Sequence, residues 1–168
     1  MEDKLEIERK YIIEMPDIAI LSAQAEYTAT EIEQIYLDAN ERITHRVRSR
    51  KSKDGIVYTE TKKIKISAFT YIEDEHNITE DEYNSLSKSI KSGTRVIKKK
   101  RYTFVFGPQL FEIDVYPEWE HTAIMETELS SEDAVVNMPP FIRIKREVTG
   151  NRAYSNAGMS HEFPTEDK

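Results

Sequence analysis

Charged and uncharged residues alternate along many short segments of this chain, and within most segments the charges have one sign. Arg46, Arg48 and Arg50 alternate with Val47 and Ser49. Because alternate side chains of a β-strand point to the same face, such a segment predicts a strand with one charged face. Similar segments contain Thr61, Lys63 and Lys65; Glu73 and Glu75; Lys99, Arg101 and Thr103; Glu112 and Asp114; Glu126 and Glu128; and Arg143, Lys145 and Glu147.

The pattern predicts a mostly β chain with a few helices. The best helix candidate is 80–92, where Thr79 and Glu82 form a capping box and Gly93 is the expected end. The remaining predicted elements are short helices at 17–26 and 131–137 and strands at 4–13, 33–38, 43–51, 56–66, 70–76, 95–106, 110–116, 122–129 and 141–149.

Two arrangements of these strands fit the alternation. An antiparallel sheet with one wet, charged face is common in proteins. A solvated face, however, would more often mix both signs within a strand. If the sheet closes instead, its lumen holds acids on one wall and bases on another, and the apolar face looks outward and is covered by helices. The sorting by sign favours the closed arrangement.

The first strand adds a specific chemical pattern. Glu6, Glu8 and Lys10 share one face, and Ile7 takes the other. Two adjacent carboxylates suit hard divalent cations such as Mg²⁺, which prefer oxygen ligands. A lysine one step further suits a phosphate or a water molecule that attacks it. This face is therefore a candidate metal and phosphate site.

Composition limits the classes of function. The 168 residues predict one domain over 1–160, followed by a flexible polar tail over 161–168. The net charge of −7 argues against general nucleic-acid binding. With no cysteine, no apolar run long enough to span a bilayer and no secretory signal, we expect a cytoplasmic protein without disulfides or membrane contact, as a monomer or homodimer. The four histidines show no metal-ligand spacing, and five glycines without a Walker motif exclude P-loop chemistry.

An ordered series of short motifs resembles the CYTH, or triphosphate tunnel metalloenzyme, family. The series covers residues 6–156, and each motif is weak alone. The motifs are Glu6-x-Glu8-x-Lys10, Gln34-x-Tyr36-Leu37, Arg46-x-Arg48, Thr61-x-Lys63, Glu73-x-Glu75, Lys99-x-Arg101-Tyr102, Glu112-x-Asp114, Glu126-x-Glu128, and Glu147-Val148-Thr149 leading to Tyr154-x-Asn156. The chain is most similar to the short bacterial inorganic triphosphatases of that family.

The resemblance implies an α+β, mostly β fold: a closed antiparallel barrel of about eight strands that forms a charged tunnel, with helices packed outside. It also implies hydrolysis of inorganic triphosphate to pyrophosphate and phosphate with Mg²⁺ or Mn²⁺. A class IV adenylate cyclase, a thiamine or nucleoside triphosphatase, and a non-catalytic polyphosphate- or nucleotide-binding module remain open as alternatives, because the pattern of residues does not show a base or thiamine pocket.

The resemblance also assigns roles to residues, with a small-molecule triphosphate as the partner. The expected metal ligands are Glu6, Glu8, Asp114, Glu126 and Glu128, with Glu112 less certain. The expected catalytic residues are Lys10, Arg48 and Lys63. The expected substrate-binding residues are Lys10, Arg46, Arg48, Lys63, Glu73, Glu75, Lys99 and Arg101. We expect Arg50, Lys65, Lys98 and Lys100 to be solvated or peripheral.

Three expectations concern particular positions. Lys62 and Lys63 could exchange roles by a shift of register. Ala153 stands before Tyr154 where the family often has arginine, so a contact at the tunnel mouth is expected to be missing. Lys10, surrounded by cations and metal, is expected to have a lowered pKa that helps proton transfer; an ion pair with Glu75 or Glu147 is its structural alternative.

Overall fold

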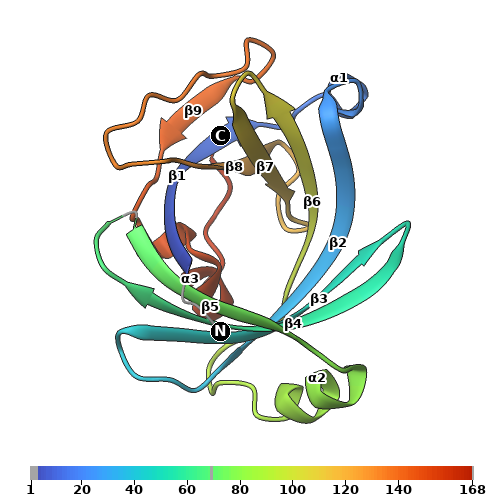
Figure 1. Cartoon of the computed structure of the whole chain (residues 1–168), viewed down its shortest axis with the longest axis vertical. Coiled ribbons are helices and arrows are strands. Elements are labelled where there is room, and N and C mark those ends of the chain that lie inside the picture. Colours follow the sequence, from blue (N-terminus) through green and yellow to red (C-terminus); the bar gives the residue numbers. More distant parts are fainter. Residues whose placement is uncertain (1–3, 69, 168) are drawn as a thin grey trace.

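One antiparallel sheet closes into a barrel in the computed structural model, which describes residues 4–68 and 70–167 (Figure 1). The strand order is β5-β4-β3-β2-β6-β7-β8-β1-β9, and an additional β1–β5 pairing closes the ring of eight strands. The strands are β1 (Lys4–Glu14), β2 (Ala25–Leu37), β3 (Ile43–Ser52), β4 (Gly55–Lys65), β5 (Thr70–Ile78), β6 (Ile97–Phe106), β7 (Gln109–Val115), β8 (Thr122–Glu128) and β9 (Ile144–Glu147). The predicted closed barrel is confirmed, with β9 added outside the ring by pairing with β1.

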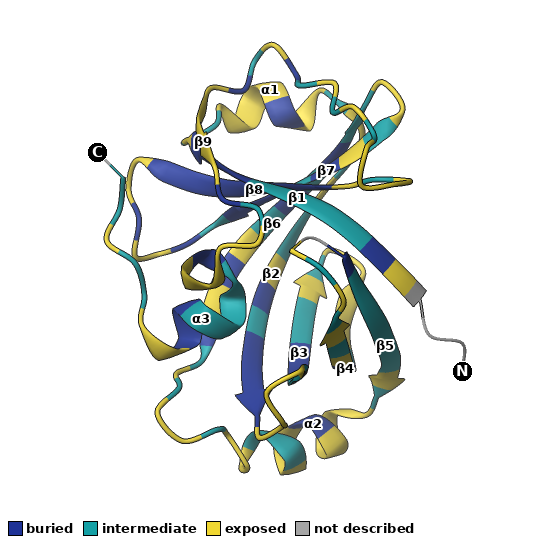
Figure 2. Ribbon diagram, turned by 90° about the vertical axis from the view of Figure 1, so that its left-hand side faces the viewer, coloured by how far each residue is buried: buried dark blue, intermediate teal, exposed yellow. Residues whose placement is uncertain are grey.

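Short helices pack at the ends and sides of the barrel (Figures 1 and 2). They are α1 (Ile18–Ser22), α2 (Glu80–Ser87), the 3₁₀ turn η1 (Arg152–Tyr154) and α3 (Asn156–His161). Within the described ranges, no helix is long and apolar enough to cross a membrane.

Strand register places the alternating charges on the inner face. Arg48 lies opposite Gln34 on β2 and Thr59 on β4, and Lys10 lies opposite Glu126 on β8. Directly paired residues of neighbouring strands share a face of the sheet. If a residue points into the barrel, its partners on the two adjacent strands therefore point inward as well. The charged faces of successive strands therefore meet in one lumen.

Most of the apolar face looks outward and is covered, as the closed arrangement requires. Phe104 and Phe111 are fully buried beneath Leu21 of α1, and Val47 is buried beneath Tyr83 of α2. The interior also has an apolar end. There, Ile12, Tyr36, Tyr116 and Ile124 are buried with Tyr154 and Met159. This inner cluster limits the charged lumen to part of the barrel's length.

The region around β2 corrects the prediction of a helix over 17–26. The helix α1 is only five residues long, and β2 begins at Ala25 rather than at 33. Residues Ala23 to Glu26 favour a helix by propensity. Hydrogen bonding to β6 overrides that propensity, with Glu26 in the left-handed region (φ 54°) where the register shifts. Pairing with β6 thus determines the conformation of this segment.

The helix predicted over 80–92 is present but shorter than expected. The capping box of Thr79 and Glu82 is confirmed, but α2 ends at Ser87 instead of 92. The chain then pairs with β2, because Ile90 bridges Leu37 and the Lys91 amide donates to the Tyr36 carbonyl.

The segment 131–137 is irregular instead of helical. The side chain of Gln109 bonds to the backbone of both Val135 and Asn137, which holds this segment outside a helical conformation. The last predicted strand, 141–149, is also shorter than expected, since only 144–147 form β9.

The polar residues after His161 lie against the barrel. Trp119 Nε1 donates to the Pro164 carbonyl, and Phe163 packs edge-to-face on Trp119 with ring centres 5.4 Å apart. The Glu166 carboxylate accepts from the backbone amides of residues 120–122. Asp167 forms an ion pair with Arg146 of β9. The predicted tail is thus tied to β8 and β9 by several independent contacts.

Candidate active site in the barrel lumen

A polar cavity of about 590 Å³ occupies the lumen. All of the predicted site residues line it except Lys99 and Asp114. The cavity is built from residues more than a hundred positions apart in the chain. The sequence-derived site is therefore brought together by the closure of the barrel.

Strand β3 forms a wall of guanidinium groups. Arg46, Arg48 and Arg50 all line the cavity, although we expected Arg50 to be solvated or peripheral. The Nε atoms of Arg46 and Arg48 are buried and find no hydrogen-bond partner among the described residues. Burial and the like charges of Arg46, Arg101 and Arg50 lower the pKa of Arg48. This wall carries more positive charge than its protein partners neutralise.

Arg48 has one carboxylate partner, on β5. Its Nη2 atom lies 3.3 Å from Glu75 Oε1, which also accepts from the Thr61 hydroxyl at 2.7 Å. Although burial raises it, the Thr61 hydrogen bond and the nearby arginines lower the pKa of Glu75. The contact to Arg48 is long for a charge-assisted hydrogen bond, which leaves the guanidinium available to another anion.

The register of β4 places Lys63 in the lumen and Lys62 on the exposed outer face. The Lys63 ammonium lies 3.2 Å from Glu6 and 3.6 Å from Glu73. Lys65, which we expected to be solvated or peripheral, also lines the cavity. Lys98 and Lys100 are exposed and do not line it, as expected.

Lys99 and Asp114 form a buried ion cluster beside the cavity. The Lys99 ammonium lies 2.7 Å from Asp114 Oδ2, and Arg101 binds Asp114 through Nε and Nη2 at 2.7 and 2.9 Å. Despite the opposing effect of burial, these two cations lower the pKa of Asp114. Both oxygens of Asp114 already accept from Lys99 or Arg101, so a metal at Asp114 would compete with these two cations. Arg101 also pairs with Glu112 at 2.8 Å, and both of these line the cavity.

Strands β1 and β8 form an acidic wall. Glu8 lies opposite Glu128, and Lys10 opposite Glu126. Burial and the charge of Glu126 raise the pKa of Glu8 well above its ordinary value. Burial opposes ionisation of Glu126 too, but Lys10 and Arg101 lower its pKa to about 2. Within this wall, Glu8 therefore has too little positive charge nearby to offset its burial.

The donor chemistry of the acidic wall fits a hard divalent cation, because every candidate ligand is a carboxylate oxygen. The described residues do not, however, contain a preassembled group of three acidic or histidine ligands. Glu6, Glu8, Glu126 and Glu128 all line the same cavity. They are the predicted ligands that a cation in the lumen could reach.

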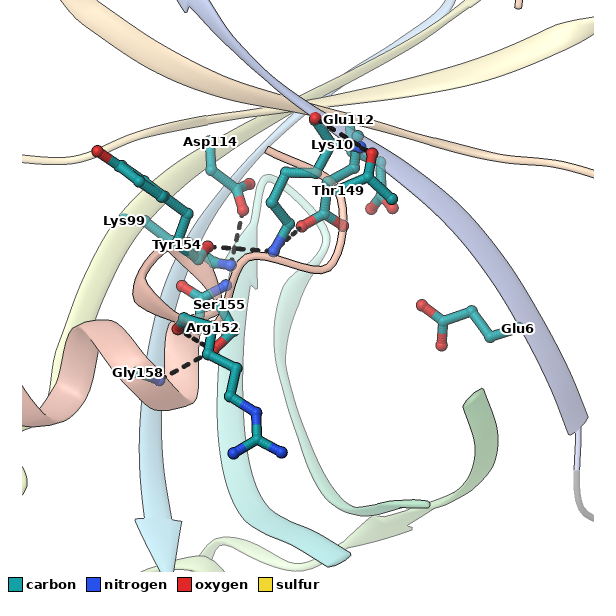
Figure 3. A network of polar contacts seen from close by, with 12 residues as sticks. Glu6, Lys10, Lys99, Glu112, Asp114, Thr149, Arg152, Tyr154, Ser155 and Gly158 are labelled. Atoms are coloured by element: carbon teal, nitrogen blue, oxygen red, sulfur yellow. Dashed lines mark hydrogen bonds and ion pairs between the residues drawn. The ribbon is translucent and has the colours of Figure 1, made fainter. Parts of the chain in front are cut away.

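The surroundings of Lys10 differ from both roles that we expected for this residue. Its ammonium lies 3.1 Å from Glu126 and donates to the Tyr154 carbonyl at 3.2 Å, so neither Glu75 nor Glu147 is its partner (Figure 3). Burial lowers its pKa, but the charges of Glu126 and Glu8 outweigh burial, and the pKa is raised. We expected a lowered pKa for Lys10 among cations and metal, whereas its carboxylate neighbours raise the pKa. Lys10 is an ammonium ion held in the lumen.

Arg152 lies next to Ala153, the position at which we expected a contact at the tunnel mouth to be missing. It is exposed and lines the cavity, and Figure 3 shows its guanidinium pointing away from the Lys10 ammonium. Gly158 packs so closely on the Arg152 carbonyl that a Cβ atom would not fit, which fixes this turn. Sequence reasoning missed Arg152, because it lies in the η1 turn, outside the alternating strands.

Sequence reasoning also missed Tyr71, which lines the cavity. The centre of its ring lies 5.4 Å from the Lys63 ammonium.

The structure has the closed antiparallel barrel and the lumen of arginine, lysine and glutamate that the resemblance to the CYTH family implies. The solved structures that are similar to the chain agree with that resemblance. No family model and no curated protein matches the chain. Among solved structures, the inorganic triphosphatase NE1496 is 29% identical over 95% of this chain and 97% of that chain, with a TM-score of 0.60.

Two archaeal structures share the fold at lower identity. The PH1819 protein from Pyrococcus horikoshii OT3 is 20% identical, covers 76% of this chain and 80% of its own, and has a TM-score of 0.57. A conserved hypothetical protein from Pyrococcus furiosus has the same identity and coverage with a TM-score of 0.58. These two similarities concern the fold alone.

Proposed function

We propose that this protein is a metal-dependent triphosphatase that hydrolyses inorganic triphosphate to pyrophosphate and phosphate in the barrel lumen. The observation that carries this proposal is the pair of buried Nε atoms on Arg46 and Arg48 without protein partners, facing a cavity of about 590 Å³. Buried donors without partners are costly, and a phosphate oxygen would satisfy them. The similarity to the inorganic triphosphatase NE1496 supports the same substrate class.

Each wall has a distinct task in this proposal. Arg46 and Arg48 bind phosphate oxygens, and Lys63 adds an ammonium from the adjacent strand. Phosphoryl transfer depends mainly on positioning and neutralisation of charge, which these groups supply without covalent chemistry. Lys10 reaches the reacting end, where it orients the phosphoryl group or the attacking water.

Glu6, Glu8, Glu126 and Glu128 would hold Mg²⁺ or Mn²⁺. Such a cation, when bound, would supply charge neutralisation and a lowered pKa for a coordinated water molecule. Asp114 orients Arg101 in this proposal, because both of its oxygens are already engaged. The cytoplasmic location and the monomeric or homodimeric state stay predictions from the sequence.

The decisive experiment measures phosphate release from inorganic triphosphate, ATP and thiamine triphosphate, each with Mg²⁺, with Mn²⁺ and with EDTA. We expect the highest kcat/KM for inorganic triphosphate. Formation of cyclic AMP from ATP at a matching rate would replace the proposal with a cyclase. Tight binding of triphosphate without turnover under any metal condition would leave a binding module instead.

A further inference from the structure

The segment after β8 reaches back to Lys10 at both its backbone and its side chain. The Lys10 amide donates to the Thr149 hydroxyl at 3.0 Å, and the Val148 amide donates to the Lys10 carbonyl at 2.8 Å. The Lys10 ammonium donates to the Tyr154 carbonyl at 3.2 Å (Figure 3). Lysine has a flexible stem and three donors, so its direction depends on such acceptors.

Tyr154 is in turn held by Arg146 on β9. Arg146 Nη2 donates to the Tyr154 hydroxyl at 2.6 Å, and the guanidinium carbon lies 5.0 Å from the centre of the Tyr154 ring. Tyr154 is only 8% exposed, so its ring cannot turn freely to find another partner. A hydrogen bond and a ring contact from one guanidinium thus fix the tyrosine from its outer end.

Asp167 fixes Arg146 from the other side. Its carboxylate accepts from Nε at 2.8 Å and from Nη2 at 3.2 Å, which is a two-pronged contact. Arg146 does not line the cavity, so it touches neither substrate nor metal directly. A partly exposed ion pair by itself contributes little to stability. The arrangement is better suited to setting the orientation of Tyr154 than to holding the barrel closed.

We propose that Arg146 is a positioning residue that holds the Lys10 ammonium in the lumen through Tyr154, with Asp167 as its anchor. This proposal rests on the proposed triphosphatase function, in which Lys10 acts at the reacting phosphate. Without Arg146, the Tyr154 side chain loses its outer restraint, which loosens the η1 turn whose Tyr154 carbonyl accepts from the Lys10 ammonium. The effect falls on the rate of the chemical step more than on substrate binding.

The kinetic test compares Arg146→Gln with Arg146→Lys and with the control Arg143→Gln, using inorganic triphosphate and Mg²⁺. Arg143 is a suitable control because its side chain is 82% exposed and, within the described ranges, its one ion pair is with Glu14, at 4.0 Å. We expect Arg146→Gln to lower kcat about 3- to 10-fold with little change in KM. Arg146→Lys should recover part of the loss, and Arg143→Gln should match the wild type.

A double-mutant cycle separates positioning from a general structural role. If Arg146 acts through Lys10, Arg146→Gln should have no further effect on kcat in a Lys10→Ala background. An equal loss in both backgrounds would overturn the proposal.

A second readout does not depend on activity: the ¹⁵N signal of the Lys10 ammonium should shift or broaden in Arg146→Gln and stay unchanged in Arg143→Gln. An unchanged signal in Arg146→Gln would overturn the positioning role. A wild type inactive on every triphosphate would refute the proposed function, and the ammonium signal would still decide whether Arg146 holds Lys10.

Discussion

Two groups of buried charges lie side by side in this barrel, and they differ in how well they are matched. Lys99, Arg101 and Asp114 neutralise one another at distances of 2.7 to 2.9 Å. Arg46 and Arg48, two to three strands away on the same inner face, keep buried donors without a partner among the described residues. The residue types are alike, so the number of partners separates a structural cluster from a binding site.

The same contrast divides the acids. Asp114 and Glu126 have pKa values lowered by adjacent cations, whereas Glu8 has a pKa raised by burial and by Glu126. Lys10 and Arg101 already neutralise Glu126, whereas a bound cation would supply the positive charge that Glu8 lacks. Among the predicted ligands, Glu8 therefore depends more on a bound cation than Glu126 does.

Removing divalent metal should have the largest effect, because the unmatched acids then have nothing to bind. We expect EDTA to abolish hydrolysis of inorganic triphosphate, Mg²⁺ or Mn²⁺ to restore it, and excess Ca²⁺ to inhibit. Glu8→Gln should lower kcat about 10²-fold or more, measured with saturating Mg²⁺. Glu31→Gln, on the exposed outer face of β2, is the control. Full turnover in EDTA would break the assignment of the acidic wall.

Asp114→Asn should be the most destabilising change, because it leaves Lys99 and Arg101 buried with too little negative charge. We expect a loss of about 3–5 kcal/mol in the free energy of unfolding, measured by chemical denaturation. A variant with wild-type stability and no activity would instead make Asp114 a member of the unmatched, functional group.

Arg48→Met should give the opposite result. Because like charges surround Arg48, its removal should leave the stability of the free protein unchanged or higher. Transition-state stabilisation should fall by about 2–4 kcal/mol, read from kcat/KM. Unfolding of this variant would show that the β3 wall is structural.

Lys63→Ala should also damage kinetics without unfolding the protein, whereas Lys62→Ala on the outer face should have no effect. Damage by Lys62→Ala alone would contradict the register of β4 that the structure shows.

Lys10 joins the two groups, since it neutralises Glu126 and faces the cavity. We expect Lys10→Ala to lower kcat about tenfold or more while KM changes little, measured under steady-state conditions. A variant with normal turnover and only a lower melting temperature would move Lys10 to the matched, structural group.

The smallest effect concerns acid stability. The folded pKa of Glu126 is about 2, below its ordinary value of 4.5. Its contribution to stability is therefore complete above about pH 4.5 and is lost as pH falls from there toward 2. Denaturation curves for the wild type and Glu126→Gln should thus differ at neutral pH and converge near pH 2. Curves that stay equally far apart would show that the carboxylate charge is not what stabilises the fold.

Predictions from sequence were most successful where alternation is strict. The strands that carry Arg46, Lys63 and Glu126 have the predicted faces, because a period of two is set by the backbone itself. Predictions were weakest where local propensity and distant pairing disagree. Residues 25–32 joined β2 through β6, and 131–137 followed the side chain of Gln109.

The sequence by itself determined which side chains share a face and therefore which residues can enter the lumen. It could not decide which of them would be neutralised by their neighbours. Asp114 and Glu8 look alike in an alternating strand, but the pairing of β6 with β7 places two cations on Asp114, and the pairing of β1 with β8 brings a second acid near Glu8. Charge matching depends on which strands pair and in which register, and only the tertiary structure sets both.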